Sequence, residues 1–190
     1  MSSDKRSAVL IMDYQTDIVP NFTKNDPDLT KRVNRVSDAA RKKSIPVIYI
    51  VVQFRPGHPE VNDKGGFKGL KEKGQFIEGT KGASVHESVA PKPGDLTVAK
   101  RRVGAFSGSD LDHILKAKGI EHLVLMGLST TGVLLSTVRA AYDLDYSLTV
   151  ISDGSADFDP EVHRFAMEKV ISKQATVMTA DAYVAALAKG

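Results

Sequence analysis

The sequence predicts a three-layer α/β/α protein built around a mostly parallel six-stranded sheet. Six short apolar runs, rich in β-branched residues, have the composition of strands buried on both faces. Between most of them lie segments whose apolar residues recur at helical spacing. Because alternating strands and helices are joined by right-handed crossovers, we expect a parallel sheet with helices on both faces. The length of 190 residues fits a single domain, 1–190.

The predicted strands recur along the whole chain. Each is a short run of mainly apolar residues, as in Val-Ile-Tyr-Ile-Val-Val at 47–52. In chain order the strands cover residues 8–12, 46–53, 96–99, 122–126, 147–151 and 175–178.

Five helices are predicted from the apolar periodicity. The first places Leu29, Val33 and Val36 on one face, and Gly119 ends the second. The helices cover residues 28–43, 109–118, 131–144, 160–172 and 180–189.

The segment 54–95 breaks the alternation of strands and helices. It is rich in Gly, Pro and Lys and has only a weak helical pattern at 67–72. Loops of this length inside a domain are usually functional, so we interpret the segment as a lid or a subunit-contact loop.

The composition excludes several classes of function. The 26 Lys and Arg residues are interspersed with 23 Asp and Glu residues, so no nucleic-acid partner is indicated. The apolar runs are too short to cross a membrane. Without cysteine, the chain has no disulfide, thiolate metal site or thiol nucleophile. No cleavage pattern follows the first apolar run, so we expect a cytoplasmic protein, although signal-independent secretion leaves no such pattern.

Candidate site residues follow the ends of the predicted strands. In an open parallel sheet the ligand crevice lies outside these carboxyl ends. Asp13, Lys100 and the segment 129–133 would bring a carboxylate, an ammonium group and a helix N-terminus together there. Taken singly, each has a structural alternative: Asp13 as a turn or capping residue, Lys100 as a solvated strand end, and 129–131 as an N-cap cluster.

Three segments together resemble the motifs of the isochorismatase-like hydrolases. They are Ala-Val-Leu-Ile-Met-Asp-Tyr-Gln at 8–15, Val-Ala-Lys-Arg-Arg-Val-Gly-Ala-Phe at 98–106, and Gly-Leu-Ser-Thr-Thr-Gly-Val at 127–133 with its continuation to 141. The resemblance implies that Asp13 and Lys100 are the first two members of the Asp–Lys–Cys triad of the family's amidases. The Cys position falls on Val133, which cannot act as a nucleophile. The metal-ligand positions of nicotinamidases fall on Val52 and Phe54, so we expect no metal.

The resemblance then favours the isochorismatase branch, which does not use the cysteine. It implies hydrolysis of a vinyl ether, isochorismate to 2,3-dihydroxy-2,3-dihydrobenzoate and pyruvate, without a covalent intermediate or cofactor. Asp13 is the expected general acid, while Lys100 binds a substrate carboxylate or stabilises charge on the ether oxygen. We expect Lys100 to lower the pKa of Asp13, so that only a bound anionic substrate raises it.

The remaining site residues are expected to bind a small anionic substrate in a homo-oligomer. They are Gln53, Arg55, Ser129, Thr130 and Val133, with Val52 an alternative to Gln53 because the strand register is open. The family resemblance also implies a cis peptide bond before Ser129.

Two other functions remain open. The chain could be a catalytically silent member that binds a small carboxylate or serves as a scaffold. Alternatively, it could hydrolyse another small ester or amide through water activated by Asp13 as a base, with Lys100 keeping that base ionised.

Overall fold

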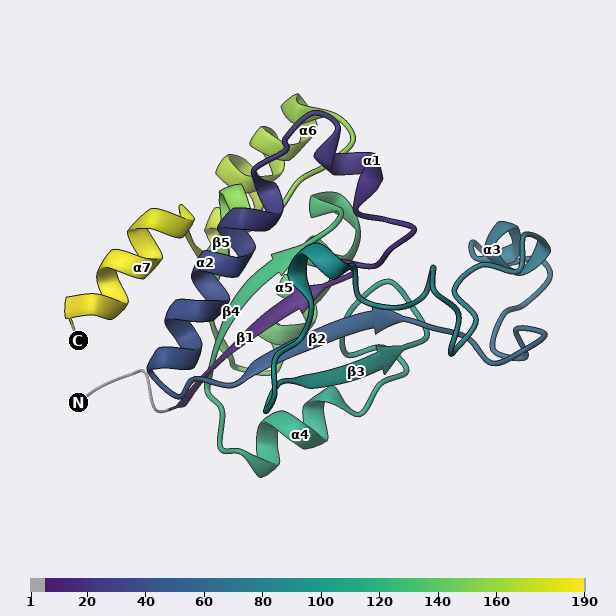
Figure 1. The fold of residues 1–190 in the computed structure, drawn as a ribbon, viewed down its shortest axis with the longest axis horizontal. Helices are drawn as coiled ribbons and strands as arrows, with labels where there is room; N and C mark the ends of the chain where they lie inside the picture. Colours follow the sequence, from purple (N-terminus) through teal and green to yellow (C-terminus); the bar gives the residue numbers. More distant parts are fainter. Residues whose placement is uncertain (1–5, 190) are drawn as a thin grey trace.

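The computed structural model describes residues 6–189 and has a six-stranded, all-parallel sheet between two layers of helices (Figure 1). The strand order is β3-β2-β1-β4-β5-β6. This confirms the predicted fold class. The strands are β1 (Ser7–Met12), β2 (Val47–Val52), β3 (Leu96–Lys100), β4 (His122–Gly127), β5 (Ser147–Ile151) and β6 (Thr176–Met178).

The chain reverses its direction of travel across the sheet at β1. β2 and β3 lie on one side of it, whereas β4, β5 and β6 lie on the other. At such a switch point the connections leave β1 and β4 in opposite directions, which opens a crevice at their carboxyl ends. The fold therefore places the ends of β1, β3 and β4 where a ligand site is expected.

Apolar side chains alternate between two cores on the two faces of the sheet. Leu10 and Met12 pack toward α4 (Leu111–Ala117) and α5 (Leu135–Asp143), and Val9 and Ile11 face the opposite core. That second core is covered by α2 (Leu29–Lys42) and α7 (Ala180–Lys189), which lie together on one side of Figure 1. Burial on both faces explains why the strands are apolar runs without alternation.

Two predicted helices are interrupted. The helix expected over 131–144 begins with a kinked turn, Thr130–Leu134, in which Gly132 has the non-helical angles φ −89° and ψ −107°. The helix expected over 160–172 consists of α6 (Pro160–Phe165), a π turn over Ala166–Val170 and a 3₁₀ turn over Ile171–Lys173. The spacing of apolar residues does not reveal these interruptions, because α, 3₁₀ and π turns can each direct the same apolar side chains into the core.

The segment 54–95 folds over the carboxyl ends of β2 and β3 (Figure 1). Its helical content is α3 (Lys68–Glu72) and a 3₁₀ turn over Glu87–Val89. Phe54, Val61 and Phe76 form a small core of their own with the end of β2. The segment is thus packed at the edge of the sheet where the candidate residues lie.

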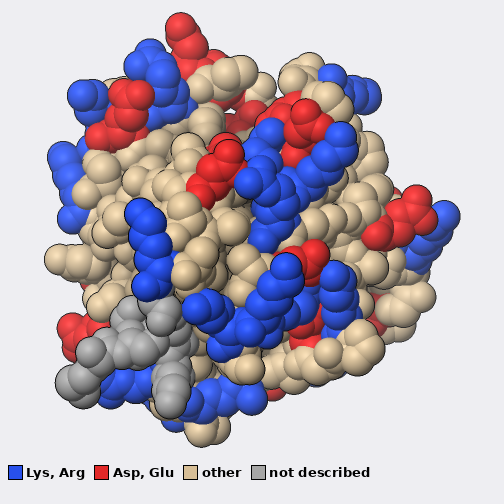
Figure 2. Space-filling model, turned by 60° about the vertical axis from the view of Figure 1, so that its left-hand side comes forward, with Lys and Arg blue, Asp and Glu red and all other residues tan. Residues whose placement is uncertain are grey.

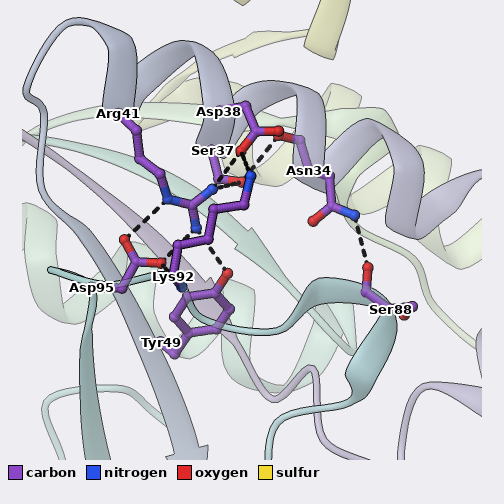
Figure 3. A network of polar contacts seen from close by, with 8 residues as sticks. All are labelled: Asn34, Ser37, Asp38, Arg41, Tyr49, Ser88, Lys92 and Asp95. Carbon is purple, nitrogen blue, oxygen red and sulfur yellow. Dashed lines mark hydrogen bonds and ion pairs between the residues drawn. The ribbon is translucent and has the colours of Figure 1, made fainter.

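A polar network fastens the end of this segment to α2 (Figure 3). The Arg41 guanidinium donates to Asp95 at 2.6 Å and to the Tyr49 hydroxyl at 3.2 Å. Lys92 donates to Asp38 at 2.6 Å. Arg41 and Asp95 are both largely buried, so the contact is less screened than a surface pair.

Acidic side chains lie among the basic ones on the face shown in Figure 2.

The helix α1 (Pro20–Thr23), which follows β1, was not predicted because four residues are too few to show helical periodicity. No helix among residues 6–189 is both long and apolar enough to cross a membrane.

Candidate active site

Asp13 is the first residue after the central strand β1. Its φ of 60° turns the chain away from the strand, and its backbone N–H donates to the Ile50 carbonyl at 2.8 Å. The side chain is buried, with Oδ2 accepting from Lys100 at 2.9 Å. Oδ1 is also buried but has no hydrogen-bond partner among residues 6–189. A buried unpaired oxygen costs free energy in folding, which is a reason to look for a function.

Lys100 is the last residue of β3 and reaches Asp13 across the end of β2. Its side chain is 2% exposed, and Nζ also donates to the carbonyls of Arg102 at 3.0 Å and Val103 at 2.9 Å. These three acceptors match the three protons of the ammonium group. The structure thus brings the two predicted catalytic residues together and holds the cation in one orientation.

Burial raises the pKa of Asp13 above its ordinary value of 3.8, and the nearby Lys100 opposes this shift without overcoming it. Lys100 does lower this pKa, as expected, but the expectation of a net downward shift is wrong. It considered the attraction between the two charges but not the loss of hydration of the carboxylate, which is the larger effect here. The carboxyl group is consequently easier to protonate than an exposed aspartate.

The turn after β4 forms the third wall of the site. The Leu128-Ser129 peptide bond is cis, as the family resemblance implied. The Ser129 hydroxyl accepts from the Gly132 N–H at 3.2 Å, and the Thr130 hydroxyl bonds to the ring of His163 at 2.7 Å. Both hydroxyls therefore hold the turn, and in this structure neither is bonded to Asp13 or Lys100.

Val133 is buried in the core beneath this turn, with 2% exposure. A Cβ placed on Gly127 would lie 3.0 Å from a Val133 methyl group and 3.3 Å from Met12. The isopropyl group is therefore tightly packed at the end of β4. It occupies the position where the resemblance places the cysteine of the amidases.

Gln53 and Arg55 do not reach the ion pair. In the register of the sheet Val52 is paired with Lys100, and the Gln53 amide donates to the Ala83 carbonyl at 3.2 Å. The Arg55 side chain is 62% exposed and donates to Glu60 at 2.6 Å. Glu60 lies in the segment 54–95, whose contacts the sequence did not predict.

Gln15 is a site residue to which sequence reasoning gave no role. It is fully buried, accepts from the Val52 N–H at 2.8 Å, and donates to the carbonyls of Val52 at 2.9 Å and Ala83 at 2.8 Å. It thereby joins the end of β1 to β2 and to the overlying segment. The sequence could have indicated this role, because Gln15 lies two residues after Asp13 in the same motif.

His58 follows the metal-ligand positions of nicotinamidases, and its buried ring bonds to the Gln75 carbonyl at 2.7 Å. Across residues 6–189, no group of three or more His, Cys, Asp or Glu side chains is arranged to hold a metal ion.

Comparisons with known proteins found similar sequences and a similar fold. A profile of the isochorismatase domain matches residues 7–182. A probable isochorismatase from Pseudomonas chlororaphis is 34% identical over 187 residues, covering 95% of this chain and 86% of that protein. The ureidoacrylate amidohydrolase RutB of Rhizobium rhizogenes is 28% identical over 162 residues, covering 76% of this chain and 66% of that protein. The structure of an isochorismatase family protein from Burkholderia thailandensis has a TM-score of 0.82 at 24% identity, covering 97% of this chain and 96% of that one.

Proposed function

The chain belongs to the isochorismatase family of hydrolases, and from this premise we propose that it hydrolyses the vinyl ether of isochorismate by general acid catalysis. The products are pyruvate and 2,3-dihydroxy-2,3-dihydrobenzoate. One observation carries the proposal: the Asp13 carboxyl is buried, has a raised pKa and has an oxygen, Oδ1, with no hydrogen-bond partner in the described part of the chain. A proton held on this oxygen therefore has no competing acceptor among those residues.

In the proposed reaction, protonated Asp13 gives its proton to the terminal methylene carbon of the enolpyruvyl group. The carbon that carries the ether oxygen becomes an oxocarbenium ion, and water adds to it. The water loses a proton, which restores the Asp13 carboxyl. In the resulting hemiketal the bond to the ring oxygen breaks, the hemiketal hydroxyl loses its proton to form the ketone of pyruvate, and the ring oxygen takes up a proton to become a hydroxyl.

Lys100 has a supporting part in this proposal. When Asp13 has donated its proton, the ammonium group 2.9 Å away stabilises the carboxylate that remains. The negative charges of the bound substrate favour the protonated form of Asp13. Arg55 can bind a substrate carboxylate only by leaving Glu60. Gln53 and Ser129 are proposed to line the substrate site, whereas Thr130 and Val133 are almost fully buried and are not proposed to contact the substrate.

The main alternative is hydrolysis of a small amide by a water molecule that Asp13 activates as a base. The similarity to a ureidoacrylate amidohydrolase supports this alternative. The raised pKa of Asp13 opposes it, because a general base must be ionised to accept a proton. With no cysteine in the chain and Val133 at the motif position, an acyl-enzyme on sulfur is not available to either reaction.

The test is to incubate the purified protein with isochorismate in D₂O and to follow pyruvate by NMR. Protonation of the methylene carbon predicts that one solvent deuterium enters the pyruvate methyl group at each turnover. Ureidoacrylate and simple amides are assayed in parallel for ammonia release. Amide hydrolysis with isochorismate inert would reject the proposal, and failure with all substrates would favour the catalytically silent alternative.

A further inference from the structure

We propose that His163 is a positioning residue of the active site, whose ring acts through the Thr130 hydroxyl to hold the turn after β4 in the conformation that catalysis requires. The inference rests on the proposed function, because it concerns the same site. The ring nitrogen Nδ1 and the Thr130 hydroxyl oxygen are 2.7 Å apart. His163 lies on α6 and Thr130 lies in the turn, so this bond joins an outer helix to a wall of the site.

The outer side of the turn is attached to the segment that follows β5. The Thr130 N–H donates to the Ala156 carbonyl at 2.8 Å. The N–H and the hydroxyl of Thr131 both donate to Asp157 at 2.7 Å, but these contacts are exposed to solvent. Thr130, in contrast, is fully buried. Loss of its bond to His163 would therefore leave a buried hydroxyl unpaired, which costs more than the loss of an exposed contact.

Helical backbone bonds alone do not hold this turn, because Gly132 has non-helical backbone angles. Side chains hold it as well. Within the turn, the Ser129 hydroxyl accepts from the Gly132 N–H at 3.2 Å, and the His163 ring contacts the turn from outside. Without the outer contact, fewer bonds would fix the place of Ser129 relative to Asp13.

α6 holds the His163 ring in a defined place. The Asp159 side chain caps the helix by accepting from the Glu161 N–H at 2.8 Å, and the His163 N–H donates to the Asp159 carbonyl at 3.0 Å. The ring also lines a cavity of about 440 Å³ together with Phe22 and Phe158. Removing the ring would therefore enlarge this cavity on the side of Thr130 and loosen the turn.

The ion pair is held independently of this turn. The Asp13 N–H donates to the Ile50 carbonyl, and Lys100 donates to two backbone carbonyls of the loop after β3. Loss of the His163 bond should thus leave the acid intact and displace a wall that orients the substrate. We expect kcat to fall by at least about 10-fold while KM changes by less than about 3-fold, because the turn orients the reacting atoms but supplies no charge for binding the anion.

Four variants separate the bond from the two residues that form it. Thr130→Val and His163→Ala remove the bond, and each should show this loss of kcat. Thr130→Ser keeps the hydroxyl, and His163→Asn places an amide atom near the position of Nδ1, so both should retain kcat within about 3-fold. Thr130→Val combined with His163→Ala should lose no more than either single variant, because both substitutions break the same bond.

Thr149→Val is the matched control. The Thr149 hydroxyl bonds to the ring of His122 at 2.9 Å, which is the same pair of residue types, but His122 begins β4 at the amino edge of the sheet, away from Asp13. Both valine variants should lower the free energy of unfolding in urea titrations, whereas only Thr130→Val should lower kcat. Equal kcat values for wild type and folded Thr130→Val would overturn the proposal, since His163 would then have a structural role alone.

Amide hydrogen exchange tests the same contact without a substrate. Thr130→Val and His163→Ala should speed the exchange of peptides that cover residues 128–134 by at least about 10-fold, and Thr149→Val should not. If wild type does not hydrolyse isochorismate, the proposed function fails, and the exchange rates still decide whether His163 holds the turn. Unchanged exchange of 128–134 in Thr130→Val and His163→Ala would overturn the inference.

Discussion

Replacing Asp13 with asparagine separates catalysis from stability. The amide matches the carboxyl in size, and its oxygen can still accept from Lys100, so the local geometry is retained. It has no acidic proton to deliver. We expect turnover of isochorismate to fall by at least about 100-fold, which corresponds to about 2.7 kcal/mol in the activation barrier.

The effect on stability depends on which of two opposing effects is larger. If the ion pair were net favourable, removing one charge would leave Lys100 buried and unpaired and would cost about 3–5 kcal/mol. The raised pKa of Asp13 indicates the reverse, because ionising this carboxyl is harder in the folded state than in the unfolded chain. We therefore expect Asp13→Asn to leave the free energy of unfolding at pH 7 unchanged or to increase it.

The raised pKa of Asp13 also predicts how the free energy of unfolding depends on pH. Above the ordinary value of 3.8 and below the raised pKa, the folded state binds more protons at Asp13 than the unfolded state does. The stability of wild type should thus fall as the pH rises through this window, and the Asp13→Asn variant should lack that component.

The assay combines pyruvate release with urea unfolding followed by circular dichroism at several pH values. Wild type and Asp13→Asn are compared under identical conditions. A loss of about 3 kcal/mol or more in the variant at pH 7 would show that Lys100 outweighs burial. Near-native turnover by the variant would refute Asp13 as the acid.

Three further predictions concern the rest of the site. Gln15→Ala should lower the free energy of unfolding by about 3 kcal/mol in urea titrations, because it leaves the buried N–H and carbonyl of Val52 unpaired, although the Ala83 carbonyl keeps its bond from Gln53; a loss below about 1 kcal/mol would contradict this. Thiol reagents and metal chelators should leave turnover unchanged, and inhibition that added metal reverses would reveal an overlooked metal site. Val133→Gly should retain isochorismate turnover, whereas Val133→Cys should give at most weak amide hydrolysis; robust ammonia release by the cysteine variant, with isochorismate inert toward wild type, would move the protein to the amidase branch.

Local chemistry allowed the strand positions to be predicted closely. Residues 147–151 were predicted as a strand and form β5. Each of the other observed strands differs from its predicted range by one residue at one end or at both ends. The agreement is close because runs of buried apolar residues are bounded by polar ones. The juxtaposition of Asp13 with Lys100 also followed from strand ends that meet at one edge. The strand order and the register that pairs Val52 with Lys100 depend on distant contacts, which one sequence does not specify.

Other features of the site depend on quantities that residue type does not determine. The non-helical backbone angles of Gly132 kink the chain before α5, and the apolar pattern of 131–144 does not reveal this kink. The pKa of Asp13 depends on how completely the folded chain excludes water, and that exclusion comes from several elements at once. Arg55 was assigned to the substrate because it follows β2, whereas Glu60, five residues later, is its partner.

The packing of Val133 explains why Val133→Cys alone should not create an efficient thiol nucleophile. A cysteine at this position would lie under the turn, at 2% exposure, against Gly127 and Met12. Apolar burial favours the neutral thiol, whereas attack on an amide needs the thiolate. The carbonyl carbon of the amide would also have to approach within about 3.5 Å of the sulfur, in a space that the core now fills. Because Val133 offers no nucleophile, the proposed chemistry at this edge of the sheet depends on the Asp13 carboxyl, whose Oδ1 has no hydrogen-bond partner among the described residues.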